Sequence, residues 1–347
     1  MKRVAVIGGG IAGMEASAFL SAMGYSVCLI EKSNQLGGHL LQWERLFPTK
    51  RLGKEVLAYL RKGITTRIDQ RLLSSVKSSV KENNLYKLEL QDGEIIECDA
   101  VLITTGFEVF DARKKEEYGY GIYDNVITSA DLEVVFSEGQ SLKSVTGDTP
   151  RKVGFLHCVG SRDEKVGNTY CSKVCCVTAV KQAIEIKEKY PQTECYCFYM
   201  DLRMFGMRFE DLYREAQEKH GIQFIRGRIS EAAEAMDGKV IIKAEDTLIG
   251  KPIKMTLDHL VLMVGFVPSA GTREMAKLFG IPLNDFGFIQ PLDDHTLTNV
   301  STVPGVYFAG TSTGPKEITN VIADARSAAL KVASFLENYE IEKRVEN

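Results

Sequence analysis

The sequence predicts an α/β protein of two domains, in which the first domain is interrupted by the second. Three observations lead to this fold class. A short apolar strand at residues 2–7 runs through a glycine-rich turn into a helix, a related strand–glycine–helix segment lies at residues 304–318, and a separate α/β region lies between them. A chain of 347 residues fits about two domains. We place the first domain at residues 1–115 and 251–347, and the inserted domain at residues 116–250.

The N-terminal turn has the sequence GGGIAG at residues 8–13, which is the spacing of a dinucleotide-binding fingerprint. Gly8 permits the tight turn, Gly10 lets the backbone approach a pyrophosphate, and Gly13 lets helix and sheet pack closely. The start of the helix, at Ile11 and Ala12, then faces the phosphates. Because a strand precedes this turn and a helix follows it, the sequence predicts a dinucleotide site here.

The residues after the second strand indicate which dinucleotide binds. That strand, YSVCLIE, ends at Glu31, followed by Lys32, and the carboxylate is placed to accept hydrogen bonds from the adenosine ribose hydroxyls. The fingerprint alone leaves NAD and FAD open. The next turn contains Gly37, Gly38 and His39 and resembles the second glycine pair of two-dinucleotide-binding flavoproteins, which favours FAD. An ordinary loop is the alternative.

The rest of the first domain is predicted to be a β-meander at residues 71–97 and a buried strand that ends at Thr105 and Gly106. In flavoproteins that resemble this chain, the second of these segments closes over the dinucleotide.

The segment PGVYFAGTSTGPKEI, at residues 304–318, is similar to the second FAD motif of the disulfide-reductase superfamily. That motif has Asp after Ala-Gly, where this chain has Thr311, and the difference leaves the ribityl contacts open. The helix expected to open from Pro315 directs its dipole at a reduced flavin, and Lys316 adds positive charge. A capped surface helix is the alternative. The residues expected to contact FAD here are Gly310, Thr311, Pro315, Lys316, Glu317 and Ile318.

Four of the eight cysteines form a local group with the spacing C-x12-C-x3-C-C, namely Cys158, Cys171, Cys175 and Cys176. Four converging thiolates suit an iron-sulfur cube. If the adjacent pair opens a helix, its side chains diverge by about 100° and reach different irons of one cube. A zinc ion is the second alternative. It ranks below the cluster because zinc ligand pairs are usually separated by a few residues, whereas Cys175 and Cys176 are adjacent. Disulfides and inert buried thiols are disfavoured by a reducing compartment and by the clustering.

The inserted domain lacks two features of a complete pyridine-nucleotide disulfide reductase. Its strand at residues 152–157 runs into Cys158 where a second glycine fingerprint is expected, and no C-x-x-C active disulfide is present. Arg162, Lys165 and Lys173 are available to balance the charge of a cluster, or form an ordinary solvated face. A basic and aromatic stretch around residues 203–214 is suited to a partner protein or an anionic substrate, or simply to salt bridges at the start of a helix.

Together, FLHCVGSRDE, YCSKVCC and AGTSTGPKEI resemble segments of the A subunit of heterodisulfide reductase, and the resemblance extends over the whole chain. It implies a thioredoxin-reductase-like fold with FAD and a [4Fe-4S] cluster held by the four cysteines. It further implies an electron-transfer subunit of a heterodisulfide-reductase-like complex that oxidises sulfane sulfur or thiosulfate. Because the chain has no C-x2-C-x2-C run, iron-sulfur electron carriers or other subunits are expected to supply further clusters. A homodimer is expected by analogy, and no catalytic residue is predicted.

Composition limits the alternatives. The net charge of −3 with interspersed signs gives no indication of a nucleic-acid groove, and no apolar run approaches the roughly 20 residues of a transmembrane segment. Eight cysteines without an export signal indicate the cytoplasm. Three other functions remain open: a stand-alone NAD(P)H-dependent disulfide reductase, a subunit of a quinone-linked complex of sulfate respiration, and a redox-inert scaffold with zinc at the cysteines.

Overall fold

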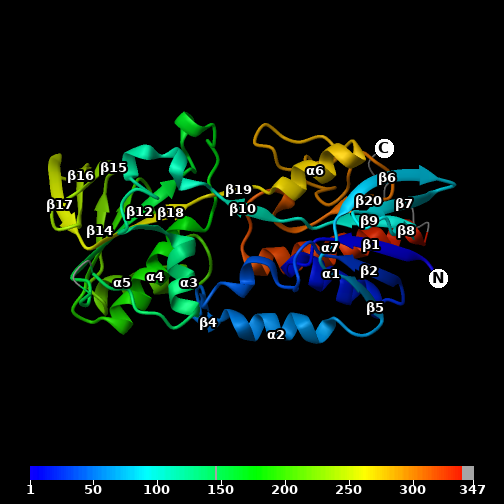
Figure 1. The fold of residues 1–347 in the computed structure, drawn as a ribbon, viewed down its shortest axis with the longest axis horizontal. Helices are drawn as coiled ribbons and strands as arrows, with labels where there is room; N and C mark the ends of the chain where they lie inside the picture. The colour runs from blue at the N-terminus through cyan, green and yellow to red at the C-terminus, as the bar shows by residue number, and fades with distance from the viewer. Residues whose placement is uncertain (145–146, 338–347) are drawn as a thin grey trace. The chain divides into compact units, whose positions relative to one another are not determined.

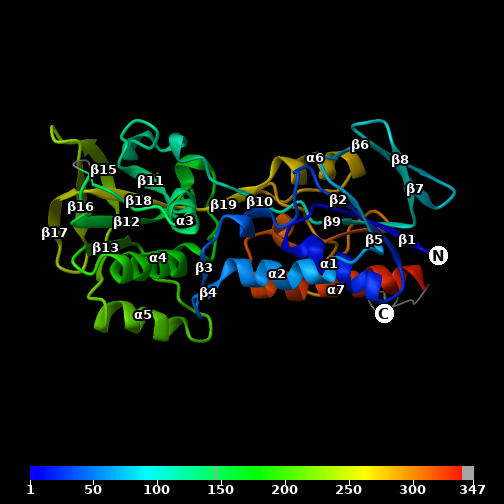
Figure 2. The ribbon, with the colours of Figure 1, turned by 60° about the horizontal axis from the view of Figure 1, so that its bottom comes forward.

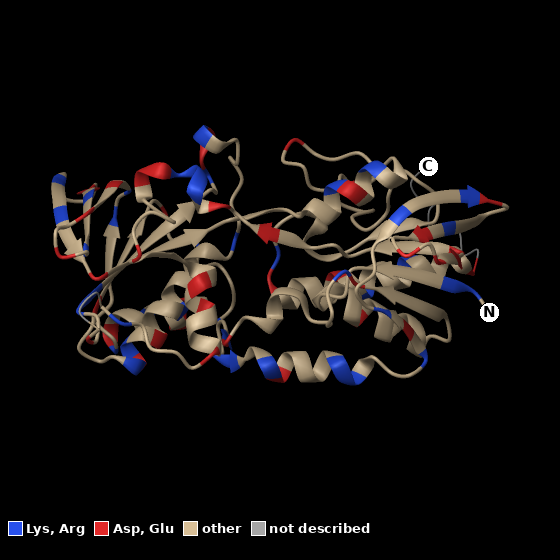
Figure 3. Cartoon of the chain, in the orientation of Figure 1, with Lys and Arg blue, Asp and Glu red and all other residues tan. Residues whose placement is uncertain are grey.

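The computed structural model describes residues 1–144 and 147–337 (Figures 1 and 2). The chain forms two compact units. The first comprises Met1–Leu41, Lys54–Glu108 and Val267–Asn347, and the second comprises Gln42–Gly53 and Val109–Phe266. Lys and Arg are interspersed with Asp and Glu over both units (Figure 3), in keeping with the small net charge.

The first unit is built on a parallel sheet of five strands in the order β20-β9-β1-β2-β5. The strands are β1 (Arg3–Ile7), β2 (Ser26–Ile30), β5 (Ile68–Arg71), β9 (Ala100–Ile103) and β20 (Val306–Phe308). Their apolar side chains are almost completely buried. The helices are α1 (Ile11–Ala22), α2 (Gly53–Gly63), α6 (Ala270–Phe279) and α7 (Ile318–Leu336). The predicted meander is present as β6 (Val76–Glu82), β7 (Leu85–Leu90) and β8 (Ile95–Cys98).

The second unit repeats this plan with a parallel sheet in the order β11-β18-β12-β13-β14. These strands are β11 (Val126–Thr128), β12 (Lys152–Val159), β13 (Glu194–Tyr199), β14 (Gln223–Arg226) and β18 (His259–Val264). Its helices are α3 (Ser129–Ser137), α4 (Cys175–Lys189) and α5 (Phe209–Glu218), and both ribbon views show α4 and α5 on the same side of the sheet. An antiparallel sheet adds β15 (Ile229–Glu234), β16 (Val240–Asp246) and β17 (Lys251–Leu257).

The shorter elements lie in the connections. Two short two-stranded pairs are β3 (Arg45–Leu46) with β4 (Arg51–Leu52), and β10 (Phe107–Val109) with β19 (Phe266–Pro268). The 3-10 helices are η1 (Gly38–Leu41), η2 (Ala112–Lys114), η3 (Glu116–Tyr118), η4 (Glu164–Val166) and η5 (Gly310–Thr313). Among the helices that the structure describes, none combines the length and the apolar character needed to cross a bilayer.

The structure divides the chain at positions other than the predicted 115/116 and 250/251. The changes fall at 108/109 and 266/267, and the short stretch Gln42–Gly53 belongs to the second unit. The strand at residues 259–264, which the predicted boundaries assign to the first domain, is β18 and pairs in parallel with β11 and β12 of the second sheet. A fully buried apolar strand has the same sequence pattern in either sheet, so its residues do not reveal its partners.

Candidate functional site

In the first unit, the predicted dinucleotide residues gather at the carboxyl ends of the parallel strands. Gly8 directly follows β1, and Glu31 directly follows β2. One residue separates Thr105 from the end of β9, and one residue separates Gly310 from the end of β20. In open parallel sheets the crevice at this edge is where ligands bind. Segments far apart in the sequence thus meet at one edge.

The glycine turn has the shape that a bound pyrophosphate requires. Gly8 has φ +112°, and a Cβ there would lie 2.5 Å from the Thr104 carbonyl oxygen. A Cβ at Gly13 would lie 1.8 Å from the Gly8 carbonyl oxygen, so helix α1 packs on the turn only because no side chain is present. A Cβ at Gly10 would meet nothing within 4 Å. This open space lies directly before Ile11 and Ala12, at the start of α1, and fits a phosphate group.

The second glycine pair lies against the first. A Cβ at Gly38 would lie 3.3 Å from Gly10 Cα, and the Gly37 N–H donates to the Gly9 carbonyl oxygen at 2.9 Å. The Glu31 carboxylate accepts hydrogen bonds from the backbone N–H groups of Gly9 at 2.6 Å and Ser33 at 2.8 Å. A carboxylate has about four acceptor positions, so Glu31 retains capacity for ribose hydroxyls.

Three further predicted residues contact neighbours within the first unit. His39 stacks on Phe107 with ring centroids 4.3 Å apart, and its Nε2 lies 3.0 Å from the Phe107 carbonyl oxygen. The Thr105 and Thr272 hydroxyl oxygens are 2.7 Å apart, and a Cβ at Gly106 would lie 3.8 Å from Thr311 Oγ1. Lys32 is exposed.

Asp324, on α7, holds the C-terminal glycine segment in place. Its carboxylate accepts from the Gly310 N–H at 2.7 Å, and Lys316 Nζ lies 3.4 Å from it while donating to the Gly310 carbonyl oxygen at 2.7 Å. A Cβ at Gly310 would lie 2.9 Å from that of Ala12, which brings this segment to the first fingerprint. Thr311 is buried.

The start of α7 differs from the expectation. The helix begins at Ile318 with Glu317 as its N-cap, so Pro315 and Lys316 precede it. The Lys316 charge faces the Asp324 carboxylate. Asp324 and Thr104 are additions to the predicted site; Thr104 Oγ1 lies within hydrogen-bond distance of the carbonyl oxygens of Ile7 and Gly8. Neither belongs to a motif, since both act through contacts distant in sequence.

In the second unit, the four clustered cysteines also lie at the carboxyl edge of a parallel sheet. Cys158 is near the end of β12, where the pairing with β18 shifts register between Leu156 and Val159. Its φ is +61°, a left-handed conformation that is uncommon for residues other than glycine. The irregular strand pairing and the unusual backbone conformation therefore occur together at the residue that carries the thiol.

The adjacent cysteines begin α4, so the condition set in the sequence analysis is met. Cys175 and Cys176 are its first two residues and are buried, and Cys171 is half-buried in the preceding loop. All eight cysteines of the chain are free thiols. The N-terminus of a helix carries partial positive charge, which favours thiolates at these two positions.

The four thiols lie close enough to act on one another electrostatically. Burial, followed by the charges of Cys176 and Cys171, raises the pKa of Cys158 to about 12. Burial raises the pKa of Cys175 well above its ordinary value, and the other three thiols add to the shift. To ionise together, these four thiols would need a strong positive charge between them, such as a metal centre carries.

Backbone and guanidinium groups surround the sulfurs. The Lys173 N–H donates to Cys171 Sγ at 3.3 Å. Burial raises the pKa of Cys176, and a hydrogen bond from the Arg203 backbone opposes it. Arg162 donates to Asp201 at 2.7 Å and interacts electrostatically with Cys158 and Cys171. Its buried Nη1 has no hydrogen-bond partner among the described residues, so a negative group at the cysteines would satisfy it.

Two side-chain networks hold the cysteine loop. The hydroxyl oxygens of Ser161 and Ser172 lie 3.1 Å apart, and Ser172 accepts from the Phe266 N–H at 2.9 Å. Asp163 and Lys115 are both 3% exposed and form an ion pair of 2.8 Å. These partners lie far apart in the sequence, and no local pattern predicts them.

The predicted cations differ in what they face. Lys165 interacts with Glu117, and Lys173 is exposed. Arg162 is therefore the predicted cation whose charge acts on the thiols.

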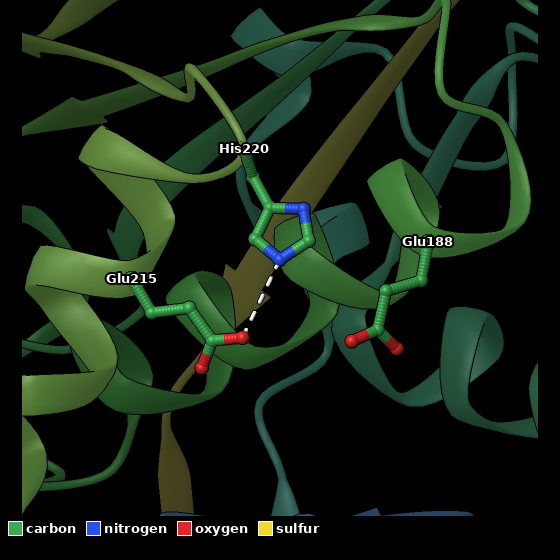
Figure 4. A group of neighbouring side chains, drawn as sticks. All are labelled: Glu188, Glu215 and His220. Atoms are coloured by element: carbon green, nitrogen blue, oxygen red, sulfur yellow. Dashed lines mark ion pairs between the residues drawn. The ribbon is translucent and has the colours of Figure 1, made fainter.

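A different group of ligand-type side chains is Glu188, Glu215 and His220 (Figure 4), whose ligand atoms lie within 4.8 Å of one another. Lys50 Nζ lies 3.0 Å from Glu188 and 2.8 Å from Glu215. An ammonium group therefore already occupies the cation position, and we interpret this group as an ion-pair network. In the part of the chain that the structure describes, no three thiol sulfurs lie within 4.8 Å of one another.

Comparison with known proteins agrees with this arrangement. A family model described as pyridine nucleotide-disulphide oxidoreductase matches residues 1–125. The A subunit of the H(2):CoB-CoM heterodisulfide,ferredoxin reductase of Methanothermobacter marburgensis is 32% identical over 97% of this chain and 64% of its own length. The iron-sulfur A subunit of the CoB--CoM heterodisulfide reductase of Methanocaldococcus jannaschii is 32% identical over 96% of this chain and 64% of its own length. Over nearly its whole length, this chain is therefore similar to proteins named as heterodisulfide reductase A subunits.

The solved structures that it resembles include thioredoxin reductases. That of Lactococcus lactis matches with a TM-score of 0.68 at 18% identity, over 97% of this chain and all of the other. That of T. acidophilum matches with a TM-score of 0.66 at 19% identity, over 97% of this chain and 99% of the other. The predicted family resemblance and fold are therefore confirmed, and they support an FAD-binding oxidoreductase. The chain spans 64% of the length of each of the two heterodisulfide reductase relatives named above.

The glycines of the fingerprint give a matched pair of variants. We expect Gly13→Ala to lower the melting temperature, because its Cβ would overlap the Gly8 carbonyl oxygen, with a cost of about 2 kcal/mol or more. Gly10→Ala should leave the melting temperature of the flavin-free protein unchanged, because nothing lies within 4 Å, but should lose FAD on purification. Thermal unfolding and flavin absorbance measure the two effects. Full FAD content in Gly10→Ala would contradict the pyrophosphate assignment.

The buried ion pair behind the cysteine loop predicts a second result. Burial favours the neutral form of Asp163, yet the hydrogen bond and charge of Lys115 lower its pKa below the ordinary value. Its stabilising contribution is therefore present above about pH 4 and is lost as the pH falls toward the folded pKa. Asp163→Asn leaves Lys115 buried without that carboxylate, and we expect a loss of about 3 kcal/mol in unfolding free energy at neutral pH.

Glu231→Gln is the control for this prediction. Its 2.5 Å ion pair with Lys243 is exposed, so the loss should stay below about 1 kcal/mol. Denaturant unfolding at pH 7 and at pH 3 separates the two variants, because the difference between Asp163→Asn and the native protein should shrink at the lower pH. Equal losses at pH 7 would show that the Lys115 pair does not hold the loop.

Proposed function

We propose that this chain carries FAD in its first unit and a [4Fe-4S] cluster on Cys158, Cys171, Cys175 and Cys176 in its second. It acts as an electron-transfer subunit of a heterodisulfide-reductase-like complex. FAD exchanges electrons in pairs or singly, whereas an iron-sulfur cluster exchanges them singly, so a chain holding both couples the two kinds of transfer. The flavin site is supported by the family and by the open space at Gly10.

The observation that carries this proposal is the position of the cysteines in the second sheet. Ligands of open parallel sheets bind at the carboxyl edge, and there β12 leads into Gly160-Ser161-Arg162 and the cysteine loop. Thiols therefore lie at the edge where a nicotinamide dinucleotide would be expected to bind. This disfavours a stand-alone NAD(P)H-dependent reductase.

The groups around the sulfurs support a bound metal centre. The N-terminus of α4, the Lys173 N–H and Arg162 all direct positive charge at these sulfurs. Such groups stabilise the negative charge of the cluster and raise its potential.

The partners and substrate follow from the family. The relatives are named as subunits of reductases of the CoB–CoM heterodisulfide, a compound with a sulfur–sulfur bond. We propose that partner subunits here act on sulfane sulfur or thiosulfate, and that this chain exchanges electrons with them and with iron-sulfur carriers. Membership of a quinone-linked complex of sulfate respiration is the alternative. Free thiols throughout fit the reducing cytoplasm, and a homodimer is proposed by analogy with the fold.

Metal analysis tests the cluster. The anaerobically purified protein should contain about four irons and four acid-labile sulfides per chain, together with one FAD. Cys176→Ser should lose or alter the cluster while FAD remains. Cys195→Ala is the matched control, because Cys195 is a buried cysteine of the same unit whose pKa is raised by burial and not by any of the four cysteines. Stoichiometric zinc without sulfide, or full flavin without metal, would contradict the assignment.

Reduction by nicotinamides tests the stand-alone alternative. Because the second sheet has cysteines at the nucleotide edge, NADH and NADPH should leave the flavin absorbance unchanged over minutes, whereas dithionite should bleach it. The experiment is followed under anaerobic conditions at the flavin band, with a thioredoxin reductase as the positive control. Rapid bleaching by NADPH would favour the solitary reductase.

A further inference from the structure

The loop between β13 and α5, at residues 200–208, lies beside the cysteine site. The Cys176 thiol donates to the Asp201 carbonyl oxygen at 3.6 Å. The Asp201 carboxylate also accepts from Arg162, which interacts electrostatically with two other thiols. The loop is therefore in contact with the cysteine group through both backbone and side chains.

Side chains of this loop alternate between core and solvent. Leu202 and Met204 pack against the core of the second unit, and the following Phe209 is buried. Between these anchors, Phe205 is 65% exposed and Met207 is 90% exposed. The loop is thus held firmly and still presents two large apolar side chains to solvent. Phe, Met and Arg are enriched at protein–protein contacts.

Four arginines lie in or beside this loop, Arg162, Arg203, Arg208 and Arg226, against three acidic side chains, Asp201 and, at the start of α5, Glu210 and Asp211. Asp201 is paired with Arg162 at 2.7 Å and with Arg226 at 3.8 Å. The side chains of Arg203 and Arg208, on either side of Phe205 and Met207, are exposed, and neither forms an ion pair with a described residue. An acidic surface would complement this loop.

We propose that this loop is the docking surface for a protein electron carrier whose redox centre is surrounded by acidic side chains. The proposal rests on the proposed function, because it requires a cluster at Cys176. Phe205 and Met207 form the apolar centre of the contact, and Arg203 and Arg208 form its charged rim. The carrier loses one electron and the cluster gains it, with no bond made or broken. A second copy of this chain is a poorer occupant, since it would bring the same positive charges.

The test uses a reduced two-cluster ferredoxin, which is an acidic one-electron carrier. Two double variants remove the apolar centre (Phe205→Ser with Met207→Ser) and the rim charge (Arg203→Gln with Arg208→Gln). Matched controls lie elsewhere in the same unit: Met236→Ser with Leu248→Ser, both exposed, and Lys251→Gln with Lys254→Gln. The Kd for ferredoxin is measured at low and high salt, and the rate of cluster reduction by stopped flow. Methyl viologen radical serves as a reductant that needs no docking surface.

We expect the apolar double variant to weaken the Kd at least tenfold, and each control to change it less than twofold. Affinity of the native protein should fall with salt, and less steeply in the Arg double variant. Methyl viologen should reduce all variants equally. Unchanged Kd values in the loop variants, no binding by the native protein, or a change of oligomeric state alone would overturn the proposal. If no variant holds iron, the proposed function fails, while the Kd comparison still decides the docking surface.

Discussion

The carboxyl edge of a parallel sheet is the constraint on which both sites depend. Parallel strands end at the same edge, so the turns that follow them converge even when they are separated by hundreds of residues. In the first unit this brings Gly8, Glu31 and Gly310 together, and in the second it brings Cys158 to α4 and to the loop after β13. The same geometric rule therefore accounts for the convergence of the glycine turns in the first unit and of the cysteines in the second.

Converting a nucleotide edge into a cysteine site requires more than four thiols. Cys158, Arg162 and Lys173 all have positive φ, a backbone conformation that is unfavourable for residues other than glycine. Such conformations persist where the surroundings determine them, and they concentrate at functional sites. Here the hydroxyl pair of Ser161 and Ser172 and the buried ion pair behind the loop supply that support. The loop is therefore determined by its contacts with the rest of the unit.

Sequence patterns predict those parts of the sites that depend on local chemistry. The fingerprint at residues 8–13 and the closely spaced cysteines at residues 171–176 are short segments that can be recognised from their residue types alone. Sequence patterns do not identify the partners Lys115, Asp201 and Asp324. Each is a charged residue outside any motif, and only the folded chain places it at its site. Sequence patterns also do not show which sheet β18 joins, because strand pairing depends on residues far apart in the sequence.

The burial of the thiols bears on how such a site could exchange electrons. A diffusing nicotinamide must enter a pocket, whereas an electron crosses a short layer of protein, so a cluster can remain shielded from water. Cys158, Cys175 and Cys176 are buried, and Cys171 is half-buried. If a cluster is bound there, selectivity for an electron-transfer partner would come from the surface over it and not from access to it. The anchored loop after β13 presents exposed apolar side chains and arginines next to Cys176, so the proposed docking surface and the environment of that thiol would share one segment.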